Sequence, residues 1–480
     1  MRCHNAVPGS ASTGSPAPDA GRMSKAFKSG LVAACVVLLA LPGQAQAPVS
    51  PPVIPPLAAA PPIAEKPRPL ATPIPLPNLP LGVVTFPNGK AINLNVGIGS
   101  SAFRHVSDVP GRIWLLTDRG PNIDCADARR IIGLEADQLC GNEKTGRLHP
   151  LPGFVPSIYG VDIGADMVGR IGVFLPIKGK SGKPVSGRPP VTNGPMGEAI
   201  FAADGKPLSP DPSGIDPEAF VRLSDGTFWI AEEFGPSLLQ VAADGTILKR
   251  LVPNGSADAF KDADYEVVPS LPAIMRWRAS NRGFEGLAIS PDERFLYVMM
   301  QSPLALPDQE AFRKSRHVRI WKIVRETGAV INEYLYLLDK PTQFQADSDG
   351  RERLPFHVHV SEIVALDAER LLVLERIDKT ARLFTIRLSD DSAIPPLFDN
   401  PDKSPSLEAL ETERLIARGM LPLEKTLILD TDQVPGLPGK IEGIAVVAPN
   451  ELILVNDNDF GIDGVRTQMF RVTLPQPLIP

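Results

Sequence analysis

The hydrophobic and polar positions of the chain repeat one pattern: an acid in a Gly-containing turn, a short apolar strand, a polar turn and a second apolar strand. The clearest copy starts at Glu285 and returns through residues 295–300. Other copies start at Glu218, at Glu442 and, in degenerate form, at Glu362. Repetition of one hairpin with acids at its ends predicts a repeat architecture.

The spacing of these leading acids sets the size of the repeat. The intervals between them are 67, 77 and 80 residues, and each has room for four strands and a long loop. We therefore predict an all-β fold over residues 81–478, a β-propeller of five or six blades with long inter-strand loops. A β-sandwich is the rival architecture, but it does not explain the repeated acids. The best helix pattern covers residues 404–418.

The first part of the chain has a different composition. Residues 1–47 have the features of a signal peptide, because a basic stretch after Met23, which we take as the true start, precedes an apolar run over residues 31–41. That run is too short to cross a membrane, so no span is expected in the mature chain. Residues 48–80 contain 13 prolines and predict an extended tether. We expect a periplasmic or secreted protein, with a lipid anchor at Cys35 as the alternative.

The cysteines and the net charge limit the compartment in which the protein works and the kinds of partner it binds. Cys125 and Cys140 remain after cleavage, and an oxidising compartment favours a disulfide between them, with two unrelated thiols as the alternative. The net charge of -6 provides no basic field for nucleic acid. We therefore expect a small-molecule partner and a monomer.

The repeated acids are the candidate metal ligands. Inner strands of propeller blades start at the central channel, so acids at matching positions converge there. Clustered carboxylates repel unless a cation lies among them, and Ca²⁺, which takes 6–8 oxygen ligands in irregular geometry, is the expected ion. The predicted ligands are Glu218, Glu232, Glu285, Glu375, Glu442, Asp457 and Asp459. The alternative is that these acids accept backbone hydrogen bonds and join neighbouring blades.

Arginines follow or precede several of these acids, and a phosphoester site needs cations for the phosphate oxygens. The predicted catalytic residues are Asp118, Arg119, Arg282, Glu285 and Arg376. Ion pairs between blades are the alternative role for the three arginines. The sequence contains no G-x-S-x-G nucleophile elbow, which argues against an α/β-hydrolase.

The same elements carry a family resemblance. Thr117-Asp118-Arg119-Gly120, Asp216-Pro217-Glu218, residues 281–286, Leu374-Glu375-Arg376 and residues 456–461 together resemble the exported bacterial family called "esterase-like activity of phytase". The resemblance covers residues 82–475 and implies a β-propeller with ester or phosphoester hydrolase activity, without a defined catalytic set.

The resulting prediction is an exported hydrolase of ester bonds, most specifically calcium-assisted hydrolysis of phosphoric esters. Two alternatives stay open: a carboxylic ester hydrolase, and a non-catalytic binding propeller with structural calcium. The sequence leaves the substrate undetermined.

Overall fold

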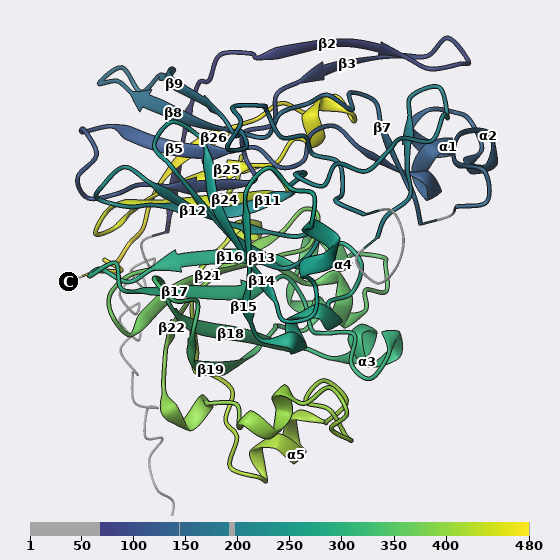
Figure 1. The fold of residues 1–480 in the computed structure, drawn as a ribbon. Coiled ribbons are helices and arrows are strands. Elements are labelled where there is room, and N and C mark those ends of the chain that lie inside the picture. Colours follow the sequence, from purple (N-terminus) through teal and green to yellow (C-terminus); the bar gives the residue numbers. More distant parts are fainter. Residues whose placement is uncertain (1–67, 144, 192–196, 480) are drawn as a thin grey trace, which may run out of the picture. The chain divides into compact units, whose positions relative to one another are not determined.

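The structure is a computed structural model that describes residues 68–143, 145–191 and 197–479. The chain divides into a unit over residues 1–64 and a unit over residues 65–480, and all described residues belong to the second. The predicted signal region over residues 1–47 and most of the predicted tether lie outside the described residues. The regular elements of the second unit are mostly strands (Figure 1).

Five sheets of four or five strands form the blades in the described part of the chain. The first blade contains β4 (Ser101–Phe103), β5 (Arg112–Leu116), β8 (Ser157–Ile163) and β9 (Gly169–Pro176). The second contains β11 (Pro217–Arg222), β12 (Phe228–Glu232), β13 (Ser237–Val241), β14 (Ile247–Pro253) and β15 (Glu266–Leu271). The third contains β16 (Phe284–Ile289), β17 (Phe295–Met300), β18 (His317–Val324) and β19 (Val330–Leu337). The fourth contains β20 (His359–Ala365), β21 (Arg370–Arg376), β22 (Ala381–Arg387) and β23 (Lys425–Asp430), and the fifth contains β24 (Ile441–Ala448), β25 (Glu451–Asn456), β26 (Met469–Thr473) and β1 (Leu70–Ile74).

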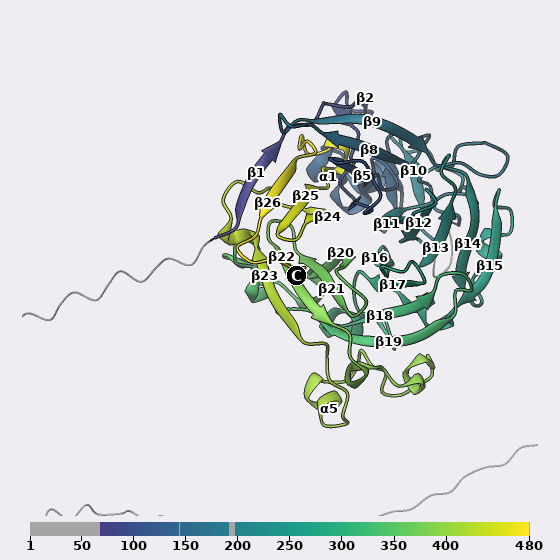
Figure 2. The same ribbon diagram turned by 90° about the vertical axis from the view of Figure 1, so that its left-hand side faces the viewer.

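The inner strands close a ring. β4 lies next to β11, β11 next to β16, β16 next to β20, β20 next to β24, and β24 next to β4. Figure 2 shows the sheets ranged around one centre, with β11, β16, β20 and β24 close to it. The predicted all-β propeller is confirmed, and five is the blade count within the described residues.

The fifth blade joins the two ends of the propeller domain. Its outer strand, β1, pairs antiparallel with β26 from Leu70 opposite Thr473 to Ile74 opposite Met469. This strand lies inside residues 48–80, which we predicted to be a tether, so the propeller begins earlier than predicted. Pro73 does not prevent the pairing, because proline is tolerated on an edge strand.

The cores lie between neighbouring blades. One cluster joins Trp229 of the second blade, Trp321 of the third and Val373 of the fourth. Another joins Leu115 of the first blade to Ile453 of the fifth. Because both faces of each sheet are covered, the inner strands are apolar along most of their length, and their few polar positions need partners.

Insertions decorate the ring. They contain the hairpin of β2 (Pro80–Thr85) and β3 (Ala91–Asn95), and a small sheet of β6 (Ile123–Asp124), β7 (Arg147–His149) and β10 (Ile200–Ala202). The α-helices are α1 (Ala128–Ile131), α2 (Ala136–Cys140), α3 (Gln309–Lys314), α4 (Gln345–Ser348) and α5 (Thr412–Ile416). The 3-10 helices are η1 (Cys125–Asp127), η2 (Ala257–Phe260), η3 (Ala273–Trp277), η4 (Pro341–Gln343), η5 (Pro355–His357), η6 (Asp390–Ser392), η7 (Pro396–Asp399), η8 (Thr431–Gln433) and η9 (Asp459–Gly461). The predicted Cys125–Cys140 disulfide is present and ties η1 to α2.

The helix predicted over residues 404–418 is wrong over most of its length, because only Thr412–Ile416 is helical. Tertiary contacts determine the conformation of residues 404–411. Glu408 is buried and pairs with Arg319 of β18 at 2.8 Å, while Leu407 and Leu410 pack in a separate cluster with Leu335. Pairing with a distant arginine therefore outweighs local helix propensity here.

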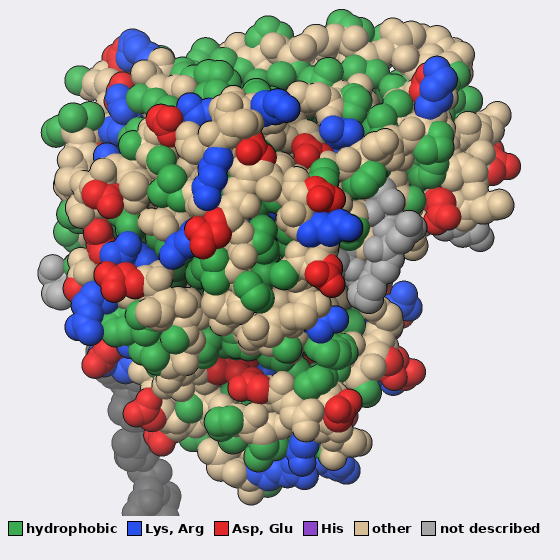
Figure 3. Space-filling model, viewed as in Figure 1, with side chains coloured by type: hydrophobic (Ala, Val, Ile, Leu, Met, Phe, Trp, Pro, Cys, Tyr) green, Lys and Arg blue, Asp and Glu red, His purple; other side chains and the backbone are tan. Residues whose placement is uncertain are grey.

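The surface seen in Figure 3 mixes acidic and basic side chains without a broad area of one sign. Within the described residues, no helix has both the length and the apolar character needed to cross a membrane.

Candidate functional site at the channel mouth

A cavity of about 650 Å³ lies at the end of the channel where the inner strands begin, and all five blades contribute to it. Its acids are Asp118, Asp124, Asp127, Asp216, Glu218, Glu233, Glu285, Asp378, Glu442, Asp457, Asp459 and Asp463, and its cations are Arg119, Arg130, Arg147, Arg282, Arg376 and Lys440. Carboxylates outnumber cations two to one, so the site has a local excess of negative charge that favours a positive ligand.

β-bulges place three of the leading acids in the cavity. The register of β11, β16 and β24 shifts at Glu218, Glu285 and Glu442, so each of these residues is the extra, unpaired residue of its strand. A bulge turns a side chain away from the regular alternation. The repeated acid in the sequence is therefore the signature of a repeated bulge at the channel mouth.

The fourth leading acid, Glu362, does not share this position. In β20 the register shift falls on Ser361, so Glu362 is one residue out of step with the others. Its carboxylate accepts hydrogen bonds from Ser101 Oγ at 2.5 Å and from the backbone of Ala102 in β4. Since the first and fourth blades are not neighbours in the ring, Glu362 links strands across the channel.

Glu232 and Glu375, two of the predicted metal ligands, also lie outside the cavity. Glu232 pairs with Arg250 at 2.5 Å and accepts a hydrogen bond from the backbone of Asp216. Glu375 pairs with Lys425 at 2.5 Å and accepts a hydrogen bond from the Tyr336 hydroxyl. Both acids have cationic partners on the outer strands of their own blades, and they join those strands together.

Three further predicted ligands are in the cavity but already have cationic partners. Lys440 Nζ lies 2.9 Å from Asp457 and 2.5 Å from Asp459, and Arg376 pairs with Glu442. Although burial opposes ionisation, the Lys440 ammonium lowers the pKa of Asp457 below its usual value. The acid-rich stretch after β25 thus has a lysine as its counter-charge.

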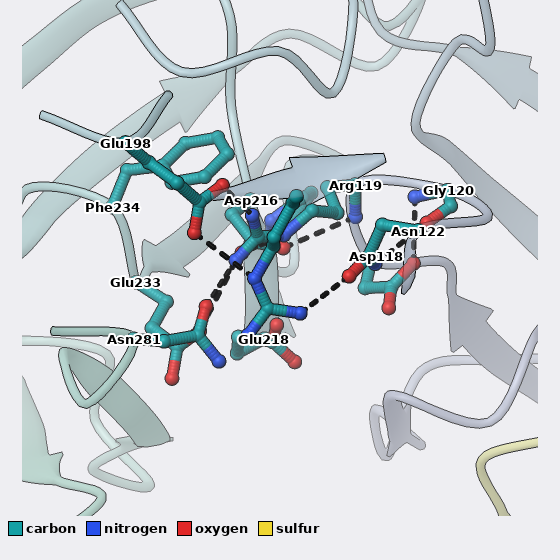
Figure 4. A network of polar contacts seen from close by, with 12 residues as sticks. Asp118, Arg119, Gly120, Asn122, Glu198, Asp216, Glu218, Glu233, Phe234 and Asn281 are labelled. Atoms are coloured by element: carbon teal, nitrogen blue, oxygen red, sulfur yellow. Dashed lines mark hydrogen bonds and ion pairs between the residues drawn. The ribbon is translucent and has the colours of Figure 1, made fainter. Parts of the chain in front are cut away.

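Arg119 is the most heavily engaged cation of the site (Figure 4). Its guanidinium lies 2.7 Å from both Asp216 and Glu198, bonds to Asn281, and packs over the Phe234 ring at 4.3 Å. The residue is 3% exposed. Its position identifies a structural counter-charge that holds strands of the first three blades together.

Three carboxylates beside Arg119 form the best candidate metal site. Asp118, Asp216 and Glu218 each offer an oxygen, and these oxygens lie within 4.8 Å of one another. Burial, reinforced by the neighbouring acids, raises the pKa values of Asp118 and Glu218 well above their usual range. Neither residue has an ion-pair partner among the described residues, so the cluster is stable only with bound protons or a cation.

A second group of acids is held by one amide. Gln301 donates Nε2 to Glu233 at 3.1 Å and to Glu285 at 2.8 Å. Burial raises the pKa of Glu233 to about 7 and the pKa of Glu285 well above its usual range. A pKa near neutral pH suits a general acid or base.

One arginine of the cavity has free hydrogen-bonding capacity. Arg282 donates Nη1 to the carbonyl of Asn281 at 2.9 Å, and no carboxylate lies within ion-pair distance of it among the described residues. The backbone directly after Arg282 requires a glycine, since a Cβ at Gly283 would lie 2.2 Å from the Glu233 carbonyl oxygen. The local backbone thus holds Arg282 at the cavity with most of its N–H groups available.

The structure adds residues that we did not predict as site members: Asp216, Glu233, Gln301, His359 and Lys440. Asp216 and Glu233 adjoin predicted residues in sequence and could have been included on that ground. Gln301 and Lys440 carry no local signal, and the role of His359, like theirs, depends on which strands lie beside it.

Comparison with known proteins decides the family. The sequence matches the Phytase-like family, described as esterase-like activity of phytase, over residues 99–460. The chain belongs to this family. Membership supports an esterase-like, hydrolytic role and agrees with the resemblance drawn from the sequence motifs.

Other similarities are more distant. An uncharacterized secreted protein of Arthroderma benhamiae is 28% identical over 184 residues, which is 35% of this chain and 35% of that protein, so the match spans about a third of the relative's length. The PQQ-bound aldose sugar dehydrogenase of Streptomyces coelicolor aligns over 85% of this chain and 98% of its own, with 8% identity and a TM-score of 0.31. The Swd1 β-propeller domain of Myceliophteria thermophila aligns over 84% and 98%, with 9% identity and a TM-score of 0.32. The propeller fold is established by the strand topology itself.

Proposed function

We propose that this protein is an exported hydrolase of ester bonds that acts on phosphoric esters at the channel mouth with the help of calcium. One observation carries the proposal: a single cavity contains a cluster of close carboxylates, Asp118, Asp216 and Glu218, and an arginine, Arg282, that has no acidic partner among the described residues. The carboxylates suit a divalent cation and the arginine suits the anionic group of a substrate. Membership of the Phytase-like family supports ester chemistry.

Calcium fits the carboxylate cluster by donor type. All donors are oxygens, and two of the three acids have raised pKa values because they are buried beside other acids. Hard, oxygen-ligated ions such as Ca²⁺ prefer such sites, whereas zinc sites usually include nitrogen or sulfur ligands. When bound, the ion supplies positive charge that stabilises phosphate oxygens as their charge rises.

Side chains of the protein would bind the substrate, position the acids and transfer protons. Arg282 would bind non-bridging phosphate oxygens through its planar array of N–H donors. Arg119 and Arg376 would hold Asp216 and Glu442 in place rather than touch the substrate. Glu233 would give or take a proton near neutral pH, oriented by Gln301.

Export from the cytoplasm is the second part of the proposal. The apolar run over residues 31–41, the Cys125–Cys140 disulfide and the secreted relative support a protein that works outside the cytoplasm. The proposed signal region covers residues 1–47, and Met23 is the proposed first residue. Cleavage can be tested by N-terminal sequencing of the protein recovered from the medium or periplasm.

A non-catalytic propeller with structural calcium is the second candidate. It is favoured by the ion pairs of Asp457 and Glu442, which show that acids of the same mouth are used to join strands. In this case calcium would join the first two blades in the way that ion pairs join other blades at the channel mouth.

The deciding experiment measures hydrolysis of an aryl phosphate and an aryl acetate, each with calcium and with a chelator. We expect phosphate release with calcium only, and its loss in Glu218→Gln but not in the exposed control Glu369→Gln. Acetate hydrolysis that ignores calcium would instead indicate a carboxylic ester hydrolase. If calcium raises the melting temperature and neither ester is hydrolysed, the binding-propeller function replaces the proposal.

A further inference from the structure

A histidine at the start of β20 lies at the cationic side of the cavity. His359 lines the cavity and stands opposite Arg376 in the antiparallel pairing of β20 and β21. The next residue, Val360, donates its backbone N–H to the Gln301 carbonyl at 2.9 Å, which fixes this end of the strand to the third blade. His359 is therefore held between the elements that carry Arg376 and Gln301.

The hydrogen bonding of the ring defines its chemical state. The Nε2 atom is enclosed and has no hydrogen-bond partner among the described residues. The backbone carbonyl of Phe356 attracts a ring proton, which favours an N–H on the other nitrogen, Nδ1. In this tautomer Nε2 carries a lone pair without a partner among the described residues, which a molecule bound in the cavity that His359 lines would satisfy.

The charged surroundings keep the ring neutral. Burial, followed by the guanidinium groups of Arg282 and Arg376 and by His357, holds the pKa of His359 well below its usual value. An anionic ester bound to Arg282 would offset this positive field. The ring would then accept a proton more readily when substrate is present than when the cavity is empty.

We infer that His359 is a catalytic residue, the general base for the attacking water, an inference that rests on the proposed hydrolase function. Nε2 takes a proton from water while the water oxygen bonds to phosphorus. The bond from phosphorus to the leaving oxygen breaks, that oxygen takes a proton from solvent, and the imidazolium releases its proton to solvent. Water and ester thereby become phosphate and alcohol, and the ring returns to its neutral form.

The test compares His359→Ala with His105→Asn in the full mature chain, with an aryl phosphate and calcium. His105 is the control, because it pairs with Glu293 at 3.1 Å and does not line the cavity. We expect His359→Ala to lower kcat about 100-fold or more, with KM changed less than about threefold. Added imidazole should restore part of the lost kcat, and His105→Asn should retain wild-type kinetics.

The outcomes are separable. If the wild type is active and His359→Ala retains its kcat, or loses it without any rescue by imidazole, His359 is not the base. If His359→Ala fails to fold by circular dichroism, His359→Gln replaces it, and an unchanged kcat in that variant overturns the inference. If the wild type itself hydrolyses no phosphoric ester with calcium bound, the proposed function fails, and this inference with it.

Discussion

Two arginines at the channel mouth differ in the number of carboxylates that each contacts. Arg119 pairs with Asp216 and Glu198 and is almost fully buried. Arg282 lines the same cavity and bonds to one backbone carbonyl. The same side chain therefore serves as a counter-charge at one position and remains available to a ligand at the other.

Arg119→Ala should lower the free energy of unfolding by about 3–5 kcal/mol, because it leaves buried carboxylates without their counter-charge. Urea denaturation measures this loss. The control is Arg129→Ala, which removes an exposed pair with Glu135 and should leave the denaturation midpoint unchanged. A stability loss for Arg119→Ala no larger than that of the control would contradict the structural role.

Arg282→Ala should act on substrate binding instead. Loss of a charge-assisted hydrogen bond of about 1.5–3 kcal/mol should raise KM for an aryl phosphate roughly tenfold or more. KM for a neutral aryl acetate should stay near its original value, because that ester offers no anion. Arg130→Ala is the control, since Arg130 borders the same cavity but is exposed and paired with Asp127. Equal effects on both esters would argue against phosphate binding by Arg282.

At the scale of elements, the propeller depends on one strand from the N-terminal side of the domain. β1 completes the fifth blade by pairing with β26, and Ile74 at its end is 2% exposed. Without β1, the edge of β26 would present unpaired backbone groups to solvent or to another chain. The disulfide acts on a different element, because it ties η1, which borders the cavity through Asp127, to α2.

A chain that begins at Leu76 should be less stable than one that begins at Glu65. Burial of Ile74 alone contributes about 1.5–3 kcal/mol, and the ladder with β26 would also be lost. We expect a lower melting temperature by calorimetry and increased light scattering on heating, because the exposed edge promotes association. Equal melting temperatures for the two chains would show that β1 is dispensable for closure.

At the scale of the whole molecule, buried titratable groups couple stability to pH in opposite directions. Burial lowers the pKa of His317 to about 4, whereas burial raises the pKa of Glu442 to about 8. The histidine contributes stability above its unfolded pKa near 6.5, and this contribution is lost as the pH falls towards 4. The buried glutamic acid contributes below its unfolded pKa, and its contribution is lost as the pH rises through 8.

The contribution of His317 to the pH dependence of stability can be isolated by comparing a variant with the wild type. Between about pH 6.5 and 4, the unfolded chain binds a proton that His317 in the folded protein does not accept, which costs about 3 kcal/mol. His317→Gln should therefore lose less stability between pH 7 and pH 4.5 than the wild type. Denaturant titration at the two pH values measures both slopes. Identical slopes would mean that His317 titrates normally in the folded protein.

Much of the site could be predicted because the repeat places equivalent residues at equivalent positions. The hairpin pattern alone indicated Glu218, Glu285 and Glu442, and all three line the cavity. It misplaced Glu362, because the Ser361-Glu362 pair gives no local sign of which residue forms the bulge. The choice between them is made by packing in the ring, where Glu362 bonds to Ser101.

The sequence by itself determined the repeat, the all-β class and the end of the channel where the acids gather, because alternation and turn residues are local properties of a strand. Only the tertiary structure decided which carboxylates have a counter-charge. Lys440, Arg250 and Lys425 neutralise Asp457, Glu232 and Glu375 through strand pairing that no single segment encodes. Among the described residues, Asp118, Glu218 and Arg282 lack a partner of opposite charge, which is visible only in the assembled ring, and these residues form the basis of the proposed function.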